Sequence, residues 1–411
     1  PQKTTMFALQ STPVVAPSTA LPRGRHTVSM SAHASAAASS NNNGRASLSK
    51  TAAVMPSVET SASPEATNSA DWTSNVQIFE YTSAANPKMA AIPVFVHPPS
   101  LHQAGETRII PFDLSEQLEV DYPATAPNLM ASFVRINDGE SIDTSCMATS
   151  QAFYVIRGSG TSNSEFGSVS WSEGDLFVLP VGKADGQGVT HTASEGNDFG
   201  GAALYWVHDQ PLMEYLGVEP KVQRFDPTLY TKDRLLAEVE TIAQNAGPKL
   251  NRLGVLLGNA ACPQTKTLTH VLWSLLNSLP PQEVQRPHRH NSVALDMAVF
   301  APPGKVYTLM GKDIDANGEI VDPIKVEWVS GGVFVTPPGW WHSHHNHSDE
   351  RAWVLPMQDA GLYTQQRTLD IRFVDAEVDN LKEGRIRGSA FTTTDAEYDE
   401  LKDIKYSDSS L

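Results

Sequence analysis

The sequence contains only two cysteines in 411 residues, Cys146 and Cys262, too few for a disulfide framework. No apolar run approaches the length of a membrane span. Lys and Arg number 30 against 46 Asp and Glu, and the formal net charge of −16 argues against nucleic acid as a partner. What is abundant is 28 prolines and 27 glycines beside 40% hydrophobic residues, which favours a turn-rich, largely β protein.

Acidic residues are absent from the first 58 positions, the first being Glu59. This segment is rich in Ser, Ala, Thr and Asn with scattered Lys and Arg, which is the composition of an organelle transit peptide. Residues 1–72 are therefore predicted to be a transit peptide, with an ordinary disordered tail as the alternative. The excess of Ser and Ala over Arg favours a plastid (chloroplast), and a mitochondrion or the cytoplasm are the alternatives.

Histidine is concentrated in one region, because six of the thirteen histidines lie within residues 288–347. His288 and His290 are two residues apart in a predicted strand, so both side chains project from the same face. A third imidazole from the cluster at 342–347, which follows a Pro-Pro-Gly turn, would complete a metal site. Neutral imidazole suits iron, copper, nickel and zinc. The alternative is that these are surface histidines or hydrogen-bonded core histidines.

Two segments of the chain repeat one pattern, residues 174–180 and, 157 positions later, residues 331–337. Each begins at a glycine turn, continues as a strand and ends at a proline, which indicates a duplicated β domain. Between them, residues 231–246 have the apolar spacing of a helix that ends at a Gly-Pro pair. The first copy has no histidine pair before Phe153, so it cannot form the same metal site.

Longer motifs carry a family resemblance. In the second copy residues 271–273, 287–295 and 336–344 are similar to signatures of double-barrel cupins, and residues 207–217 of the first copy resemble the close of a metal-free barrel. Over roughly residues 130–375 the chain resembles a bicupin of the cupin superfamily, most closely the gentisate 1,2-dioxygenase group with its salicylate and 1-hydroxy-2-naphthoate relatives. The resemblance implies an all-β fold of two double-stranded β-helix (jelly-roll) barrels.

The repeat and the resemblance together predict how the chain is divided. The expected parts are the transit or disordered segment 1–72, a first cupin barrel with a degenerate metal site at 73–222, a short helical linker at 223–262, a metal-binding second barrel at 263–375 and a charged tail at 376–411.

The resemblance also implies a mononuclear Fe(II) held by His288, His290 and His342, with Zn, Mn or Ni as alternatives. A small-molecule substrate and O2 would meet at this metal, and we expect a homo-oligomer.

Further positions correspond to substrate contacts of the family. Arg252 and Trp273 match two substrate-binding residues, and His344 matches a catalytic histidine two residues past the third ligand. Trp340 is a further candidate for an aromatic substrate pocket.

Two positions depart from the family pattern. The arginine expected six residues after the second ligand is Asp296, and the aspartate expected fourteen residues after the third falls on Pro356. Exchanging a cation for a carboxylate argues against gentisate itself as the substrate. Asp296 shares strand parity with His288, and as a catalytic candidate it is either a displaced fourth ligand or a general base. The alternative is a solvated or salt-bridged acid.

The leading hypothesis is therefore a metal-dependent cupin oxygenase, resembling gentisate dioxygenase, that acts on a small hydroxylated organic compound. A second is a non-oxidative cupin lyase, isomerase or decarboxylase, and a third is a non-catalytic binding or storage bicupin, because one fold supports many chemistries.

Overall fold

A computed structural model describes residues 72–182, 188–196, 200–245 and 252–374. The predicted plastid segment 1–72, apart from its last residue, and the predicted tail 376–411 lie outside these residues. Contacts divide the chain into Pro1–Ile78 and Phe79–Leu411, and every helix and strand named below belongs to the second part. In the described residues no helix combines the length and the apolar character that crossing a membrane would require.

The first barrel is built from two antiparallel sheets, with strand orders β11-β8-β5-β10-β3-β2 and β4-β9-β6-β7. Its strands are β2 (Arg108–Pro111), β3 (Met130–Asn137), β4 (Ser141–Thr144), β5 (Ala148–Arg157), β6 (Ser159–Ser164), β7 (Gly167–Ser172), β8 (Leu176–Gly182), β9 (Val189–Ala193), β10 (Gly201–His208) and β11 (Thr228–Tyr230).

The second barrel repeats this plan with the orders β1-β18-β15-β20-β13-β12 and β17-β16-β19-β14-β21. Its strands are β1 (Val96–His97), β12 (Leu253–Leu256), β13 (Trp273–Leu279), β14 (Val284–His290), β15 (Ala294–Phe300), β16 (Val306–Gly311), β17 (Ile324–Glu327), β18 (Val333–Thr336), β19 (Trp341–Asn346), β20 (Ala352–Gln358) and β21 (Ile371–Phe373). The predicted fold of two jelly-roll barrels is thereby confirmed.

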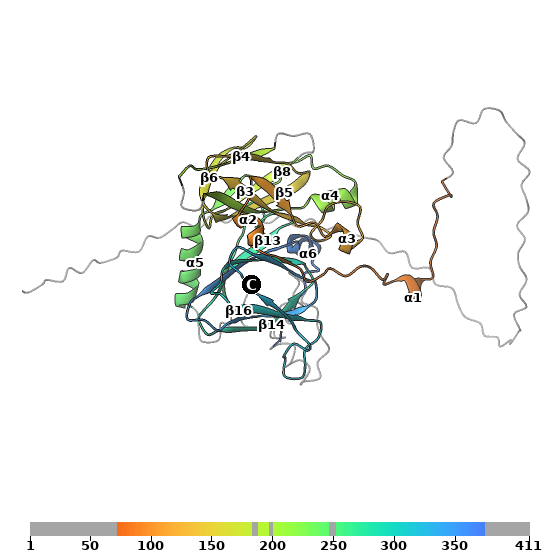
Figure 1. Ribbon diagram of the computed structural model, residues 1–411. Coiled ribbons are helices and arrows are strands. Elements are labelled where there is room, and N and C mark those ends of the chain that lie inside the picture. Colours follow the sequence, from red (N-terminus) through yellow and green to blue (C-terminus); the bar gives the residue numbers. More distant parts are fainter. Residues whose placement is uncertain (1–71, 183–187, 197–199, 246–251, 375–411) are drawn as a thin grey trace, which may run out of the picture. The chain divides into compact units, whose positions relative to one another are not determined.

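Helices are short and lie outside the barrels (Figure 1). The longest, α5, occupies the stretch between the barrels where the apolar spacing predicts a helix, and it buries Leu235 and Val239. Two others, α4 and α6, follow the last long strand of each barrel and so occupy equivalent places in the repeat. The helices of the described ranges are α1 (Tyr81–Ala84), α2 (Ser100–Gln103), α3 (Ser115–Leu118), α4 (Gln210–Leu216), α5 (Lys232–Asn245) and α6 (Ala360–Gln366).

Two edge strands do not follow the predicted domain boundaries. β1 precedes the first barrel in sequence but pairs with β18 of the second, whereas β11 follows the first barrel and pairs with its β8. The predicted range 73–222 for the first barrel therefore includes a strand of the second, and the predicted linker 223–262 contributes a strand to each barrel through β11 and β12. The physical reason is that an edge strand pairs with whichever edge is open, and this is not encoded in its own short sequence.

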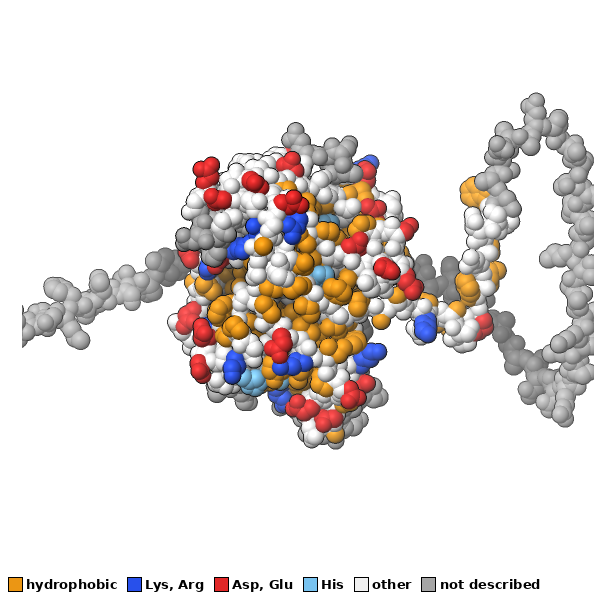
Figure 2. Space-filling view, viewed as in Figure 1, with side chains coloured by type: hydrophobic (Ala, Val, Ile, Leu, Met, Phe, Trp, Pro, Cys, Tyr) orange, Lys and Arg blue, Asp and Glu red, His pale blue; other side chains and the backbone are white. Residues whose placement is uncertain are grey.

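The largest core cluster lies where the two six-stranded sheets meet. β10 is buried at every position, because one of its faces points into its own barrel and the other toward the second barrel. Tyr205 from β10 donates a hydrogen bond to the backbone carbonyl of Leu295 in β15 across this contact, at 3.3 Å. Figure 2 shows hydrophobic side chains gathered in the middle of one face, with acidic side chains toward its edges. Packing of sheet on sheet thus fixes the frame that holds the site.

Candidate metal centre

Three histidines from two paired strands meet in the second barrel. His288 and His290 lie on β14, His342 lies on the neighbouring β19, and the register places His288 opposite His342. Each offers a ring nitrogen, and these three atoms lie within 4.8 Å of one another. Within the described ranges no other group of three or more His, Cys, Asp or Glu residues brings its ligand atoms so close. We call these three residues the triad.

Hydrogen bonds orient two rings of the triad. The Nδ1 atom of His290 lies 2.9 Å from the backbone carbonyl oxygen of Ser292, and Nδ1 of His342 lies 3.0 Å from that of Trp340. A carbonyl oxygen only accepts, so Nδ1 donates in both cases and Nε2 keeps the lone pair that a metal requires. At these two residues the donor atoms fit a metal ion.

His288 is held differently, by Arg252. The Nη2 atom of Arg252 lies 2.7 Å from Nδ1 of His288 and also donates to the backbone carbonyl of Arg286 at 2.7 Å. A guanidinium only donates, so Nδ1 accepts here and the proton of the neutral ring is on Nε2. Metal binding through Nε2 of His288 therefore requires Arg252 to release the ring.

Burial keeps the imidazoles of the site neutral. It is the largest cause that lowers the pKa of His290 to about 4 and that of His344 to about 3. Burial, reinforced by the neighbouring imidazoles, also holds the pKa of His288 and of His342 well below the ordinary value. Neutral imidazole is the form that binds metal, so at neutral pH no proton has to leave an imidazolium first.

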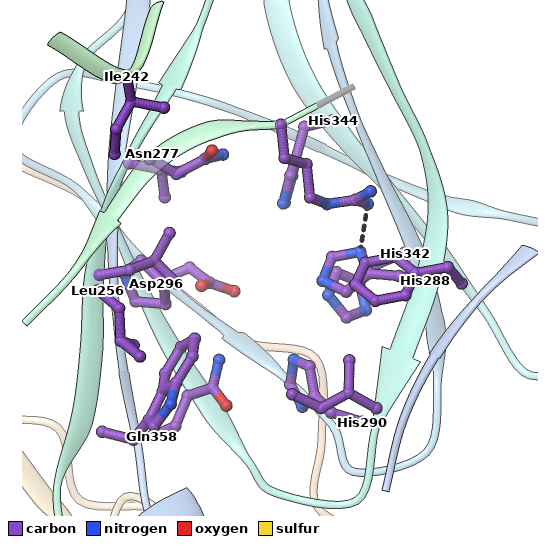
Figure 3. Close-up of a pocket in the computed structure, with 17 residues that line it drawn as sticks. Ile242, Leu256, Asn277, His288, His290, Asp296, His342, His344 and Gln358 are labelled. Atoms are coloured by element: carbon purple, nitrogen blue, oxygen red, sulfur yellow. Dashed lines mark hydrogen bonds between the residues drawn. The ribbon is translucent and has the colours of Figure 1, made fainter. Parts of the chain in front are cut away.

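The triad lines a cavity of about 450 Å³ inside the second barrel (Figure 3). In the figure the triad lies along one side, with Asn277, Asp296 and Gln358 on the opposite side. A cavity of this size, mostly apolar and with a few polar groups, is typical of a small-molecule site. Its apolar lining consists of Ile242, Gly254, Leu256, Trp273, Leu275, Val354, Pro356, Ile371 and Phe373.

Asp296 lies on β15 and is only 4% exposed. Thr336 Oγ1 donates a hydrogen bond to its Oδ2 at 2.5 Å. Burial raises the pKa of this carboxyl to about 7, although the Thr336 hydrogen bond opposes the shift. The group of potential ligand atoms around the triad does not include Asp296, which weighs against the displaced fourth ligand and leaves the acid–base role open.

His344 lies on β19, two residues beyond His342, and it also lines the cavity. Its Nδ1 is 2.9 Å from Thr308 Oγ1, which accepts a hydrogen bond from Trp328 Nε1 at 2.8 Å. Because Nδ1 is engaged by the Thr308 hydroxyl, Nε2 is the nitrogen available to a ligand. We call the hydrogen-bonded series of an indole, a hydroxyl and an imidazole, here Trp328, Thr308 and His344, a relay.

Of the two tryptophans predicted to contact the substrate, one lines the cavity and the other does not. Trp273 lines the cavity and packs with Leu369, Ile371 and Phe373. Trp340 does not line it: its ring packs against the core cluster that includes Trp328, with Lys312 Nζ 5.6 Å from the ring centroid. Trp340 contributes to the site the backbone carbonyl that orients His342.

Two polar residues of the cavity, Asn277 and Gln358, are not predicted from the sequence. Asn277 could have been found, because it shares strand parity with Trp273 and the chain alternates faces along β13. Gln358 accepts a hydrogen bond from Ser292 at 2.8 Å, and no sequence pattern marks it. Its position depends on how β20 pairs with β15, which is a long-range feature.

The first barrel carries other residues at the equivalent places. In the first barrel Thr144 pairs with Val189, and in the second barrel His288 pairs with His342. Val189 is therefore the equivalent of His342. Thr144 is the equivalent of His288. Two residues further on, Cys146 occupies the place of His290. The relay is nevertheless present here, formed by Trp171, Ser162 and His191 with distances of 2.8 and 2.7 Å.

Fold and site together define a protein of two jelly-roll barrels with a three-histidine centre in the second barrel. No family model matches the sequence, and no curated protein matches it. Among solved structures, salicylate 1,2-dioxygenase from Pseudaminobacter salicylatoxidans is similar at 14% identity and a TM-score of 0.54, over 75% of this chain and 93% of the other. The same enzyme in adducts with gentisate gives 13% identity and a TM-score of 0.55, over 72% and 90%.

At this level of identity the likeness shows the fold. The expected resemblance to bicupins of the gentisate dioxygenase type is thereby confirmed in architecture.

Proposed function

We propose that this protein is a metal-dependent cupin oxygenase that binds Fe(II) at the triad and oxidises a small hydroxylated organic compound with O2. The observation that carries the proposal is the convergence of three neutral imidazoles on a largely apolar cavity. Three histidines add no negative charge, so a bound divalent metal would retain its attraction for an anionic, chelating substrate. The metal would supply redox chemistry and a template for substrate and O2.

The residues around the triad would bind and orient the substrate. Arg252 places a cation beside His288, where an oxyanion of the substrate would bind. His344 would offer Nε2 to a second polar group, because its Nδ1 is held by the relay. Asp296 would accept a proton at Oδ1, since Thr336 already occupies Oδ2. The apolar wall would exclude water from the reacting groups.

A non-oxidative reaction is the second candidate, and Asp296 is the observation that favours it. A carboxyl whose pKa lies at about 7 can donate or accept a proton near neutral pH, as a general acid or base must. With Zn, Mn or Ni as a Lewis acid at the triad, this residue would move a proton in a lyase, isomerase or decarboxylase.

The test combines metal analysis with oxygen uptake. The wild-type protein should retain about one metal ion per chain, His290→Ala should lose it, and His345→Ala should keep it, because His345 lies on β19 outside the triad. Fe(II)-loaded protein would then be titrated without oxygen with phenolic acids, salicylate among them, while a charge-transfer band is followed. Oxygen consumption should require both Fe(II) and the compound that gives the band.

The outcomes separate the candidates. Turnover with Zn and without oxygen consumption would favour the non-oxidative reaction. A wild-type protein that retains no metal after Fe(II) loading would remove both enzymatic proposals.

A further inference from the structure

The cavity of the second barrel offers opposite charges at its two sides. On the triad side, the Arg252 guanidinium is hydrogen-bonded to His288 and lies 5.0 Å from the centroid of the Phe373 ring. On the opposite side, Figure 3 shows the Asp296 carboxylate directed into the cavity. The rest of the lining is largely apolar and includes Leu256 and Leu275. A ligand that fills this space therefore meets a cation on one side, an acid on the opposite side and mostly apolar side chains around it.

Among the described residues, the acidic end lacks a cationic partner. In the described part of the chain, Thr336 is the only hydrogen-bond partner of the Asp296 carboxylate, and no cationic side chain forms an ion pair with it. A buried carboxylate without a cation is expensive, since burial removes the water that would otherwise solvate it. A group supplied from the cavity can reach Oδ1, to which none of the described residues donates a hydrogen bond.

The fold does not need an acid at this place. Register equates Asp296 of β15 with Phe153 of β5, because Asp296 pairs with Phe334 and Phe153 pairs with Phe177. The first barrel thus forms around an apolar ring at the same position. A carboxylate whose burial the barrel could avoid is more readily explained by a ligand than by folding.

We propose that the substrate is a small zwitterion, with an oxyanion that binds between Arg252 and the triad and an ammonium group that binds Asp296 across an apolar body. The ammonium end follows from the geometry of Asp296, whereas the oxyanion end rests on the function proposed above. Asp296 would reject a carboxylate at its end of the cavity and would bind an uncharged hydroxyl more weakly than an ammonium.

The experiment uses three probes that differ in one group. The full-length Zn-loaded protein, which does not consume O2, is titrated calorimetrically with para-(aminomethyl)benzoate, para-(hydroxymethyl)benzoate and para-ethylbenzoate. The aminomethyl compound should bind about tenfold more tightly than either neutral analogue. Asp296→Asn should remove this preference while the metal content stays unchanged. Glu327→Gln, an exposed acid on β17, should leave the preference intact. Asp296→Ser serves as a second variant if the Asn form does not fold.

Two results would overturn the inference: equal affinity of the wild-type protein for all three probes, or a preference that survives the loss of Asp296. If the protein retains the metal but shows no preference for the ammonium probe, the inference of a zwitterionic substrate fails and the proposed function stands. If the wild-type protein retains no metal but still prefers the ammonium probe, the proposed function fails and the ammonium site stands.

Discussion

The two barrels use equivalent interior positions in opposite ways. In the first, Phe153 stacks on Phe177 with ring centroids 4.9 Å apart and on Trp206 at 5.7 Å. Register gives the second barrel Asp296 in place of Phe153 and Pro356 in place of Trp206. The first barrel therefore has a solid aromatic interior, whereas the second keeps a space with a carboxylate on its wall.

The difference in side-chain volume decides whether a barrel can bind a ligand. The space beside Thr144, Cys146 and Val189 in the first barrel is about 10 Å³, against about 450 Å³ beside the triad. Barrel interiors are close-packed unless side chains leave room, so the same strand frame supports either a core or a cavity. The relay occurs in both barrels, although the first barrel has no triad. The relay is therefore a structural feature of the barrel and does not depend on metal binding.

The largest expected effect comes from removing a triad residue. His290→Ala should lower the affinity for a divalent metal by more than about a thousandfold, because two imidazoles hold such ions poorly. Cys146→Ser, the equivalent change in the first barrel, should leave the metal content unchanged. Metal content is measured after dialysis against a weak chelator. Equal losses from both variants would mean that the barrels do not differ in metal binding.

Opening the aromatic stack should test whether the first barrel depends on its solid interior. Phe153→Ala removes a ring with no exposed surface and should lower the free energy of unfolding by about 3–5 kcal/mol. Chemical denaturation gives the value, with the exposed Phe300→Ala as the control. A loss below about 1 kcal/mol would show that the barrel tolerates a cavity there.

The acid in the second barrel should make stability depend on pH. Burial raises the pKa of Asp296 from 3.8 to about 7, so the folded protein holds this proton more tightly than the unfolded chain. The contribution of this group to the free energy of unfolding is therefore fully present below pH 3.8 and is lost as the pH rises to about 7. At pH 8 the metal-free Asp296→Asn variant should be more stable than the wild type by up to about 4 kcal/mol.

The measurement is denaturant unfolding of both metal-free proteins across this pH range. An unchanging difference between them would contradict a raised pKa. Glu327→Gln, at an exposed site, controls for the loss of one acid from the chain.

The smallest expected effect concerns the shared relay. Ser162→Ala in the first barrel and Thr308→Val in the second each leave an indole donor and an imidazole nitrogen unpaired, which should cost about 1–3 kcal/mol of stability. Only Thr308→Val should also weaken ligand binding, because His344 lines the cavity. Denaturation and calorimetry measure the two effects. Equal effects of both variants on ligand binding would remove His344 from the site.

Local patterns predicted much of the site. His288 and His290 are alternate residues of one strand, and strand parity also placed Asp296 on the cavity side, because side chains alternate across a sheet regardless of its partners. The same parity applied along β13 indicates Asn277. For Trp340 the sequence was insufficient, since a turn residue has no periodic face and its ring follows the neighbouring core.

What the sequence determined by itself was the duplication, the β class and the pair His288 and His290, because strand period and turn residues act over a few neighbouring positions. The local pattern left the third histidine open within residues 342–347, and the family resemblance selected His342. Only the tertiary structure decided the pairing of β1 and β11 and the contact of Arg252 with His288. It also decided that no cation among the described residues lies beside Asp296. These depend on which distant strands become neighbours. Sheet pairing and packing set that choice over long sequence separations, and no local pattern records it.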